Sequence, residues 1–215
     1  MFAALLVDGI NTIDLILNAL CSLFLYLCKK DHNNMFRDKK LLKAGLSQFS
    51  RKELEDMVIK LAGKRHNFEY LLVNYFDREG GEQWLFGEAL DGLERIFEKE
   101  YKGRSIQHRE VKRLNASAKL IKDFAVEVKN KKYEADLMMH VLRREFAFPD
   151  EMLGAGFSSY DYKLALWIKK LLQILTAKIH PDYLVDYQDE VNRMLRKLHR
   201  RSHRINTVKL LPEEI

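Results

Sequence analysis

The segment Arg193–Arg204, RMLRKLHRRSHR, carries the densest set of groups that could bind a ligand. It holds six Lys or Arg side chains, two His and no carboxylate. His199 and His203 are four residues apart, and this spacing places two imidazoles on one helical face, as a transition-metal site requires. No further ligand is near in the sequence, and the adjacent arginines would repel a cation. The pattern therefore favours a solvated basic face over a metal site.

The same segment predicts a surface for an anionic partner. Seven Lys or Arg and no Asp or Glu lie between Val191 and Pro212, so the formal net charge of +6 belongs to the end of the chain. Like charges at three- and four-residue spacing on a helix repel one another, and a bound anion relieves that repulsion. Nucleic-acid phosphates, an acidic protein surface, anionic lipid and an ordinary solvated helix end all remain open as interpretations. The expected patch comprises Arg193, Arg196, Lys197, Arg200, Arg201 and Arg204.

Other patterns contain residue types that occur in catalytic sites but lack the accompanying residues that a catalytic site needs. Asp136 and His140 share a helical face, where a carboxylate can orient an imidazole as a base. No Ser or Cys nucleophile accompanies them by motif, and such a pair is more often a surface hydrogen bond. Glu-x-x-His pairs of carboxylate-bridged metal sites and phosphate-binding Gly-rich motifs are both absent from the sequence. The sequence therefore predicts no enzyme, cofactor or metal site, and it implies no small-molecule substrate.

An aromatic stretch after residue 146 is the longest predicted loop. Pro149 and Gly154 interrupt any helical period there. Its aromatic residues are expected either to line a groove for a partner peptide, to stack on bases, or to close the end of the helical core. The candidate partner loop comprises Phe146, Phe148, Phe157 and Tyr160.

Composition indicates the elements that must position these groups. The chain has 215 residues, of which 47% are hydrophobic and 32% charged, with only 10 Gly and 3 Pro. Such a chain can bury a sizeable core, and its scarcity of turn residues favours long helices. We therefore expect an all-α protein, either a multi-helix bundle or a short α-solenoid of stacked helical hairpins.

Cap and turn signals place the individual helices. Ser50 and Glu53 have the spacing of a capping box, and Gly63 is placed to end the helix that follows. Gly80-Gly81 is expected to break the chain between two helices, and Pro181 to lie in the first turn of the last one. Apolar residues at three- and four-residue intervals predict helices over 51–62, 67–76, 82–101, about 111–128, 133–146, 160–179 and 181–203.

The first 34 residues differ from the rest in composition. Ile10–Cys28 is mostly apolar and long enough, as a helix, to approach the thickness of a bilayer, but four polar residues interrupt it. It is interpreted as a dispensable extension ahead of a start at Met35, an apolar helix packed on the body, or a membrane anchor. The basic residues that follow Cys28 would keep the body in the cytosol even if the segment crossed a membrane. A cytoplasmic location is expected, with a membrane-anchored protein as the alternative.

Three segments together resemble a known family. Leu46–Leu54 (LSQFSRKEL), Ile121–Phe124 (IKDF) and Ala135–Met138 (ADLM) are similar to an uncharacterised bacterial family of small all-helical proteins. The resemblance covers about 35–198 and implies a cytosolic helical domain without an established activity, so it assigns a role to no residue.

These patterns predict three ranges and one class of function. Residues 1–34 form the apolar segment, 35–204 a helical domain with a basic last helix, and 205–215 a C-terminal tail. We expect a non-enzymatic binding or adaptor protein with an unknown protein partner. The alternative is a nucleic-acid-binding protein whose last helix contacts phosphates, and membrane contact is expected only through residues 10–28.

Overall fold

The computed structural model describes residues 39–154 and 159–215, and the described chain is built from helices and short connections without a strand. The predicted all-α fold is thereby confirmed, and the long helices after residue 77 pack against one another as a bundle. The α-helices are α2 (Lys39–Leu46), α3 (Arg51–Ala62), α4 (Arg65–Leu71), α5 (Arg78–Glu98), α6 (Ile106–Glu127), α7 (Lys131–Phe146), α8 (Ser159–Lys178), α9 (Val185–Ser202) and α10 (Asn206–Lys209). A π-helical turn, Leu72–Phe76, follows α4, and 3₁₀ turns occupy Asp150–Met152 and Pro181–Tyr183.

Contacts divide the chain into two compact units between Lys64 and Arg65. This division falls inside the range 35–204, which composition had predicted as one domain. The predicted boundaries mark changes in polarity along the sequence. The boundary at Lys64 marks where one set of packed helices ends and the next begins, so the two need not coincide. The predicted domain ranges remain predictions.

Helices α2 and α3 belong to the first unit. The predicted capping box is present: the Glu53 N–H donates to Ser50 Oγ at 3.3 Å, and the Ser50 N–H donates to Glu53 Oε2 at 2.8 Å. Gly63 follows α3, and its N–H donates to the Ile59 carbonyl. No residue of α3 is buried, although the helix carries several large apolar side chains.

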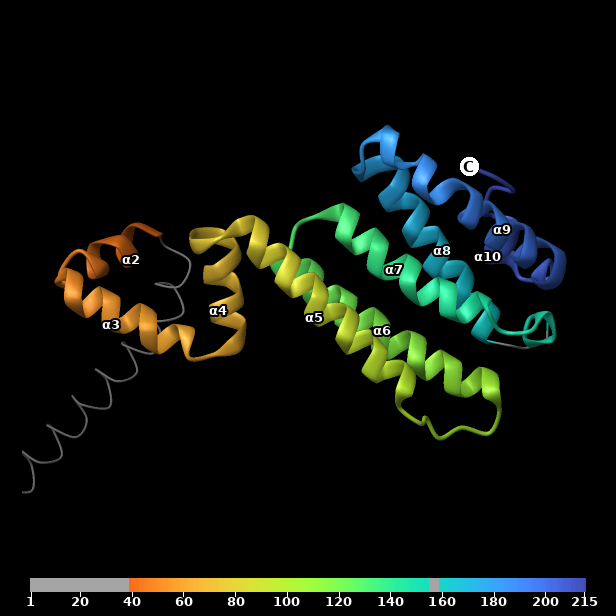
Figure 1. Cartoon of the computed structure of the whole chain (residues 1–215), viewed down its shortest axis with the longest axis horizontal. Coiled ribbons are helices and arrows are strands. Elements are labelled where there is room, and N and C mark those ends of the chain that lie inside the picture. Colours follow the sequence, from red (N-terminus) through yellow and green to blue (C-terminus); the bar gives the residue numbers. More distant parts are fainter. Residues whose placement is uncertain (1–38, 155–158) are drawn as a thin grey trace, which may run out of the picture. The chain divides into compact units, whose positions relative to one another are not determined.

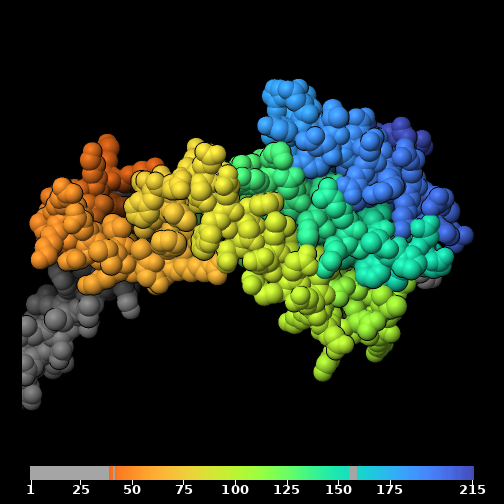
Figure 2. Space-filling view, in the orientation of Figure 1, coloured from red at the N-terminus to blue at the C-terminus, as the bar shows by residue number. Residues whose placement is uncertain are grey.

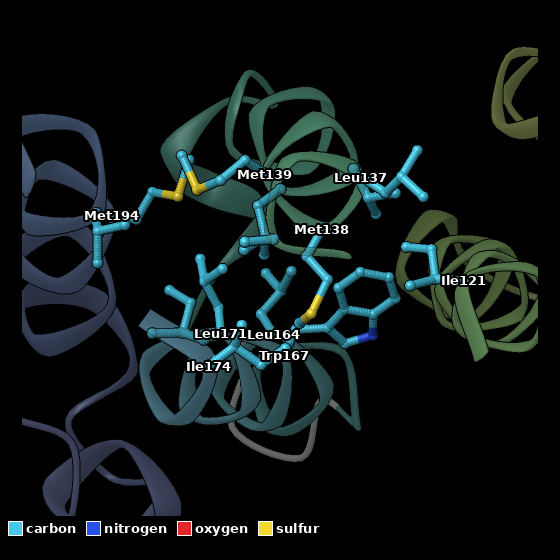
Figure 3. Packing of buried hydrophobic residues seen from close by; sticks show 14 of the residues in the cluster. Ile121, Leu137, Met138, Met139, Leu164, Trp167, Leu171, Ile174 and Met194 are labelled. Atoms are coloured by element: carbon cyan, nitrogen blue, oxygen red, sulfur yellow. The ribbon is translucent and has the colours of Figure 1, made fainter. Parts of the chain in front are cut away.

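The hydrophobic core lies in the second unit, where α8 contributes more buried residues than any other described helix. Helix α8 packs against α6, α7, α9 and α10, while α5 and α6 pack side by side (Figure 1). In Figure 3 the indole of Trp167 reaches from α8 toward Ile121 on α6, and Met139 on α7 points toward Met194 on α9. Ten of the twenty residues of α8 are buried, which gives neighbouring helices a common apolar surface to pack on.

Helix α5 contains the glycine pair that was expected to break the chain. The helix begins at Arg78, and Asp77 caps it by accepting a hydrogen bond from the Gly80 N–H at 3.0 Å. Gly81 is buried, and a Cβ built on it would lie 2.9 Å from Leu72 Cγ. The expected break is therefore wrong, because the glycines serve close packing against the preceding turn and not chain reversal.

The loop after α7 is fastened to the end of α9. Gly154 has a φ of +82°, and a Cβ built on it would lie 2.5 Å from the Arg201 carbonyl oxygen. The Gly154 N–H and the Ser202 hydroxyl both donate to Asp161 Oδ2, each at 2.7 Å. Glycine is required at position 154 because its backbone conformation and its contact both disfavour a side chain.

The C-terminal tail folds back onto the same unit. Helix α10 packs against α8 and α9 and buries Val208, and Leu211 beyond it is also buried. The side chains of Gln188 and Asn192 donate to the Ile215 carbonyl at 2.6 and 3.4 Å. Residues 205–215 therefore pack against the helices of the second unit.

Within residues 39–154 and 159–215, no helix combines the length and the apolar character needed to cross a bilayer. The apolar segment Ile10–Cys28, to which the anchor interpretation applies, lies outside the described residues.

Candidate functional site

The predicted basic patch lies on α9, where its cations alternate with the buried stripe of the helix. Val191, Met194, Leu195 and Leu198 face the core. Arg193, Arg196, Arg200 and Arg201 are exposed, as predicted, and Arg204 follows the helix and is exposed too. In Figure 2 the blue surface of α9 adjoins the teal surface of the loop after α7. The patch therefore lies beside the other predicted site.

Asp150, in that loop, is shared by three cations of the patch. Its carboxylate accepts from Lys197 at 3.0 Å, Arg200 at 2.6 Å and Arg201 at 3.4 Å. The bond from Lys197 is the main reason that the pKa of Asp150 lies below its ordinary value. The segment itself holds no carboxylate, and this one comes from a loop about fifty residues upstream in the chain.

Lys197 has a further structural role. Its ammonium also donates to the carbonyls of Phe146 and Phe148, at 3.1 and 2.9 Å. These carbonyls lie at and just beyond the C-terminus of α7, where unpaired carbonyls and the helix dipole favour a cation. Much of the charge of Lys197 is therefore used to join α9 to the end of α7.

Two other carboxylates approach the patch. Glu190 accepts from Arg143 on α7 at 2.8 Å and from Arg193 at 3.3 Å, and Glu214 in the tail accepts from Arg196 at 2.8 Å. The bond to Glu190 raises the pKa of Arg143. With Arg143 included, six cations share three carboxylates and Arg204 takes part in none of these pairs, so internal pairing reduces the positive charge of the flank without removing it.

The predicted partner loop does not present Tyr160 to a partner. Tyr160 is 0% exposed, and its hydroxyl donates to Glu145 Oε2 at 2.9 Å. Phe146 and Phe148 are half-buried and pack against the core, while Phe157 lies outside the described residues. For Tyr160 the expectation of a partner-lining role is wrong, because the side chain closes the core between α7 and α8.

A groove of about 500 Å³ nevertheless brings members of both predicted sites together. It lies between α7 and α9. Phe146 and Met194 supply apolar surface, and Arg143, Arg193 and Lys197 supply cations, with Glu190 as the one carboxylate of the lining. The lining residues are Arg143, Phe146, Ala147, Glu190, Arg193, Met194 and Lys197.

His140 and His199, one from each histidine pattern of the sequence, bond to other parts of the protein. His140 Nε2 lies 2.8 Å from Glu94 Oε1, whereas Asp136 accepts from the Tyr187 hydroxyl at 2.6 Å. His199 Nε2 lies 3.1 Å from the Pro212 carbonyl. In the part of the chain that the structure describes, no three His, Cys, Asp or Glu side chains gather as metal ligands would.

Sequence reasoning did not identify a second surface feature, an exposed aromatic cluster around the π-helical turn. Phe68 and Trp84 meet edge to face with ring centroids 6.4 Å apart, and Tyr70 and Tyr75 meet at 6.0 Å. These four rings and that of Phe76 are all exposed. The sequence does contain a signal for this cluster. The aromatic residues between 68 and 76 fall on more than one face of a helix, so packing against a single core cannot bury all of them.

Comparisons with known proteins gave no match, whether to a family model, a curated protein or a solved structure. The resemblance to a bacterial helical family stays a prediction.

Proposed function

We propose that this chain is a non-enzymatic binding or adaptor protein, located in the cytoplasm, whose α7–α9 groove holds an acidic segment of another protein. The observation that carries the proposal is the lining of the groove, where three cations and one carboxylate surround the apolar surface of Phe146 and Met194. Carboxylates of a partner would meet the cationic excess, and an apolar partner side chain would cover Phe146.

Arg193 is the cation of the groove best suited to contact a partner. Its side chain is 73% exposed, and its distance to Glu190 is 3.3 Å, whereas Arg143 bonds the same carboxylate at 2.8 Å. Arg143 can therefore neutralise Glu190 while the guanidinium of Arg193 turns to an incoming carboxylate. Paired guanidinium–carboxylate bonds also give such a contact a defined geometry.

Nucleic-acid binding, the alternative expected from the sequence, has less support. Three carboxylates lie within the flank that phosphates would approach, and each would repel a phosphate. An acidic peptide has few charges to place, so it can occupy the groove and avoid Asp150 and Glu214. A phosphate backbone would extend along the whole flank.

The proposal is tested by capture of proteins from a nuclease-treated lysate of the source cells, with quantitative comparison of three forms of the chain. Arg193→Glu is expected to lower the recovery of the partner about tenfold or more, because it places a like charge against the partner's carboxylates. Lys169→Glu, an equal charge change at an exposed position of α8, serves as the matched control and should recover the partner fully.

Equal recovery of every protein by the parent chain and by Arg193→Glu would contradict the proposal. The alternative is measured on the same variants with a fluorescent single-stranded oligonucleotide over a salt series. Tight, salt-sensitive binding that Arg193→Glu weakens and Lys169→Glu does not would favour nucleic acid as the partner.

A further inference from the structure

A second cavity lies between α6, α7 and α8, and it shares no lining residue with the α7–α9 groove. Its volume is about 180 Å³. Ile121, Met138 and Trp167, all buried, form its apolar floor, and Figure 3 shows these three side chains meeting where the helices converge. The full lining is Asn115, Ala118, Ile121, Met138, Lys163, Leu166, Trp167 and Lys170.

The polar part of this lining contains two ammonium groups. Lys163 and Lys170 lie seven residues apart on α8, which separates them by about 10 Å along the helix. Both therefore stand on the same side of α8, with Leu166 and Trp167 between them in sequence. The lining contains no carboxylate, so its formal charge is positive.

The two lysines differ in their partners. Lys170 donates to Glu134 Oε1 at 2.9 Å, and the other oxygen of this carboxylate accepts from Lys131 at 2.6 Å. The ammonium of Lys163 forms no ion pair or hydrogen bond with any other residue in the ranges 39–154 and 159–215. The charge of Lys170 is thus satisfied inside the protein, and the charge of Lys163 is available at the cavity.

These features define the chemistry of a ligand. A cation would be repelled by Lys163, and a neutral apolar molecule would form no charge-assisted bond with its ammonium. A molecule with one anionic group and a short apolar body satisfies both parts of the cavity. The cavity is smaller than the roughly 300–1,000 Å³ typical of sites for drug-sized ligands, so the body must be a short chain or a single ring.

We propose that this cavity binds a small amphipathic carboxylate, with the carboxylate on Lys163 and the apolar body against Ile121, Met138 and Trp167. The sequence implied no small-molecule ligand because the lining residues come from three helices and form no motif along the chain. The site is independent of the proposed adaptor function, so either can fail without the other.

Octanoate is a suitable probe, and Trp167 reports on it directly. The chain has two tryptophans, and Trp84 is 44% exposed and does not line the cavity, so Trp84→Phe leaves Trp167 as the only indole. In that background we expect a saturable change of tryptophan fluorescence with octanoate. The neutral analogue 1-octanol should bind about tenfold more weakly or worse, because it cannot form the charge-assisted bond with Lys163.

Substitution of the lysine separates this site from nonspecific adsorption. Lys163→Met keeps the aliphatic stem and removes the charge, and it should weaken octanoate binding about tenfold or more while leaving 1-octanol binding unchanged. Lys169→Met, the same change at an exposed neighbouring position of α8 that does not line the cavity, should leave both affinities unchanged. Far-ultraviolet circular dichroism of each variant checks that the helices are retained.

Three results would overturn the proposal. The first is the absence of a saturable response to octanoate at millimolar concentration. The second is an equal affinity for octanoate and 1-octanol, and the third is an equal loss of binding in Lys163→Met and Lys169→Met. Each would show that the anionic group gains nothing from Lys163.

Discussion

Helix α7 carries two buried glutamates that face the same neighbour and behave in opposite ways. Glu134 and Glu145 are eleven residues apart, about three helical turns, so both point toward α8. Glu134 is 4% exposed and lies between the ammonium groups of Lys131 and Lys170. Although desolvation opposes it, these two bonds hold the pKa of Glu134 below its ordinary value.

Glu145 has no such cation bonded to it. It is 2% exposed, its Oε1 has no hydrogen-bond partner among the described residues, and Oε2 accepts only from the Tyr160 hydroxyl. Desolvation, with the negative charge of Glu110 second, raises the pKa of Glu145 to about 8. One end of the α7–α8 contact therefore holds an ionised group and the other a neutral acid, because two ammonium groups bond Glu134 whereas no bonded cation offsets the desolvation of Glu145.

The largest expected change in unfolding free energy comes from replacing Glu145 by a side chain that cannot ionise. Its pKa is higher in the folded chain than the ordinary 4.5, so the folded state holds a proton that the unfolded state releases. The unfolding free energy should fall as pH rises from 4.5 to 8, by on the order of a few kcal/mol. Glu145→Gln should remove this component, so that the variant gains stability relative to the parent chain across that window.

Denaturant unfolding of both proteins at several pH values measures this difference. At pH 4.5 and below, the Glu145 carboxyl of the folded parent chain is neutral. The difference in unfolding free energy between parent and variant at that pH therefore measures the effect of the amide replacement alone. A stability difference that does not change between pH 4.5 and pH 8 would show that Glu145 is ionised throughout.

A smaller effect of opposite sign is expected for the paired glutamate. Glu134→Gln removes both ion pairs and should destabilise the fold by about 1–2 kcal/mol near neutral pH. Because the pKa of Glu134 is lowered in the fold, its contribution is present above the ordinary value of 4.5 and is lost as pH falls through the folded value. Thermal unfolding should therefore show the two proteins converging in acid, and a constant gap at all pH values would contradict the assignment.

The smallest effect is expected at Asp150, which is paired like Glu134 but lies at the surface. Asp150→Asn should lower the melting temperature slightly at low salt, and the difference should shrink as salt screens the three cations. A larger loss than that of Glu134→Gln would mean that the loop attachment, and not charge alone, depends on this carboxylate.

The sequence was sufficient to predict the long helices and the cap of α3, because those signals are local, but Pro181, expected in the first turn of the last helix, begins a separate 3₁₀ turn ahead of α9. Ser50 and Glu53 lie three residues apart, and the apolar stripe of α9 follows its helical period. The glycines of α5 were misread because the side chains that require their small size, Asp77 at Gly80 and Leu72 at Gly81, are not part of a helix-breaking signal. Propensity gives no information about what packs against a residue.

The candidate site was predictable only in part, for a related reason. The arginines of α9 are visible as a run, but the carboxylate that pairs three of its cations is about fifty residues away in the chain. Tyr160 reads as a loop aromatic until α7 and α8 come together around it. The cavity at Lys163 requires three helices at once. Ion pairs and burial that involve several helices depend on how the helices pack, which local sequence patterns do not specify.

The junction of Gly154, Asp161 and Ser202 has a consequence for how related chains should vary. Position 154 tolerates no side chain, and the two bonds to Asp161 hold the end of α9 in place. Surface arginines can exchange with lysine or disappear at little cost, so charge is a weak marker of descent here. Descendants of a common ancestor should keep these three residues together, and a chain that loses one of them should have replaced the others as well.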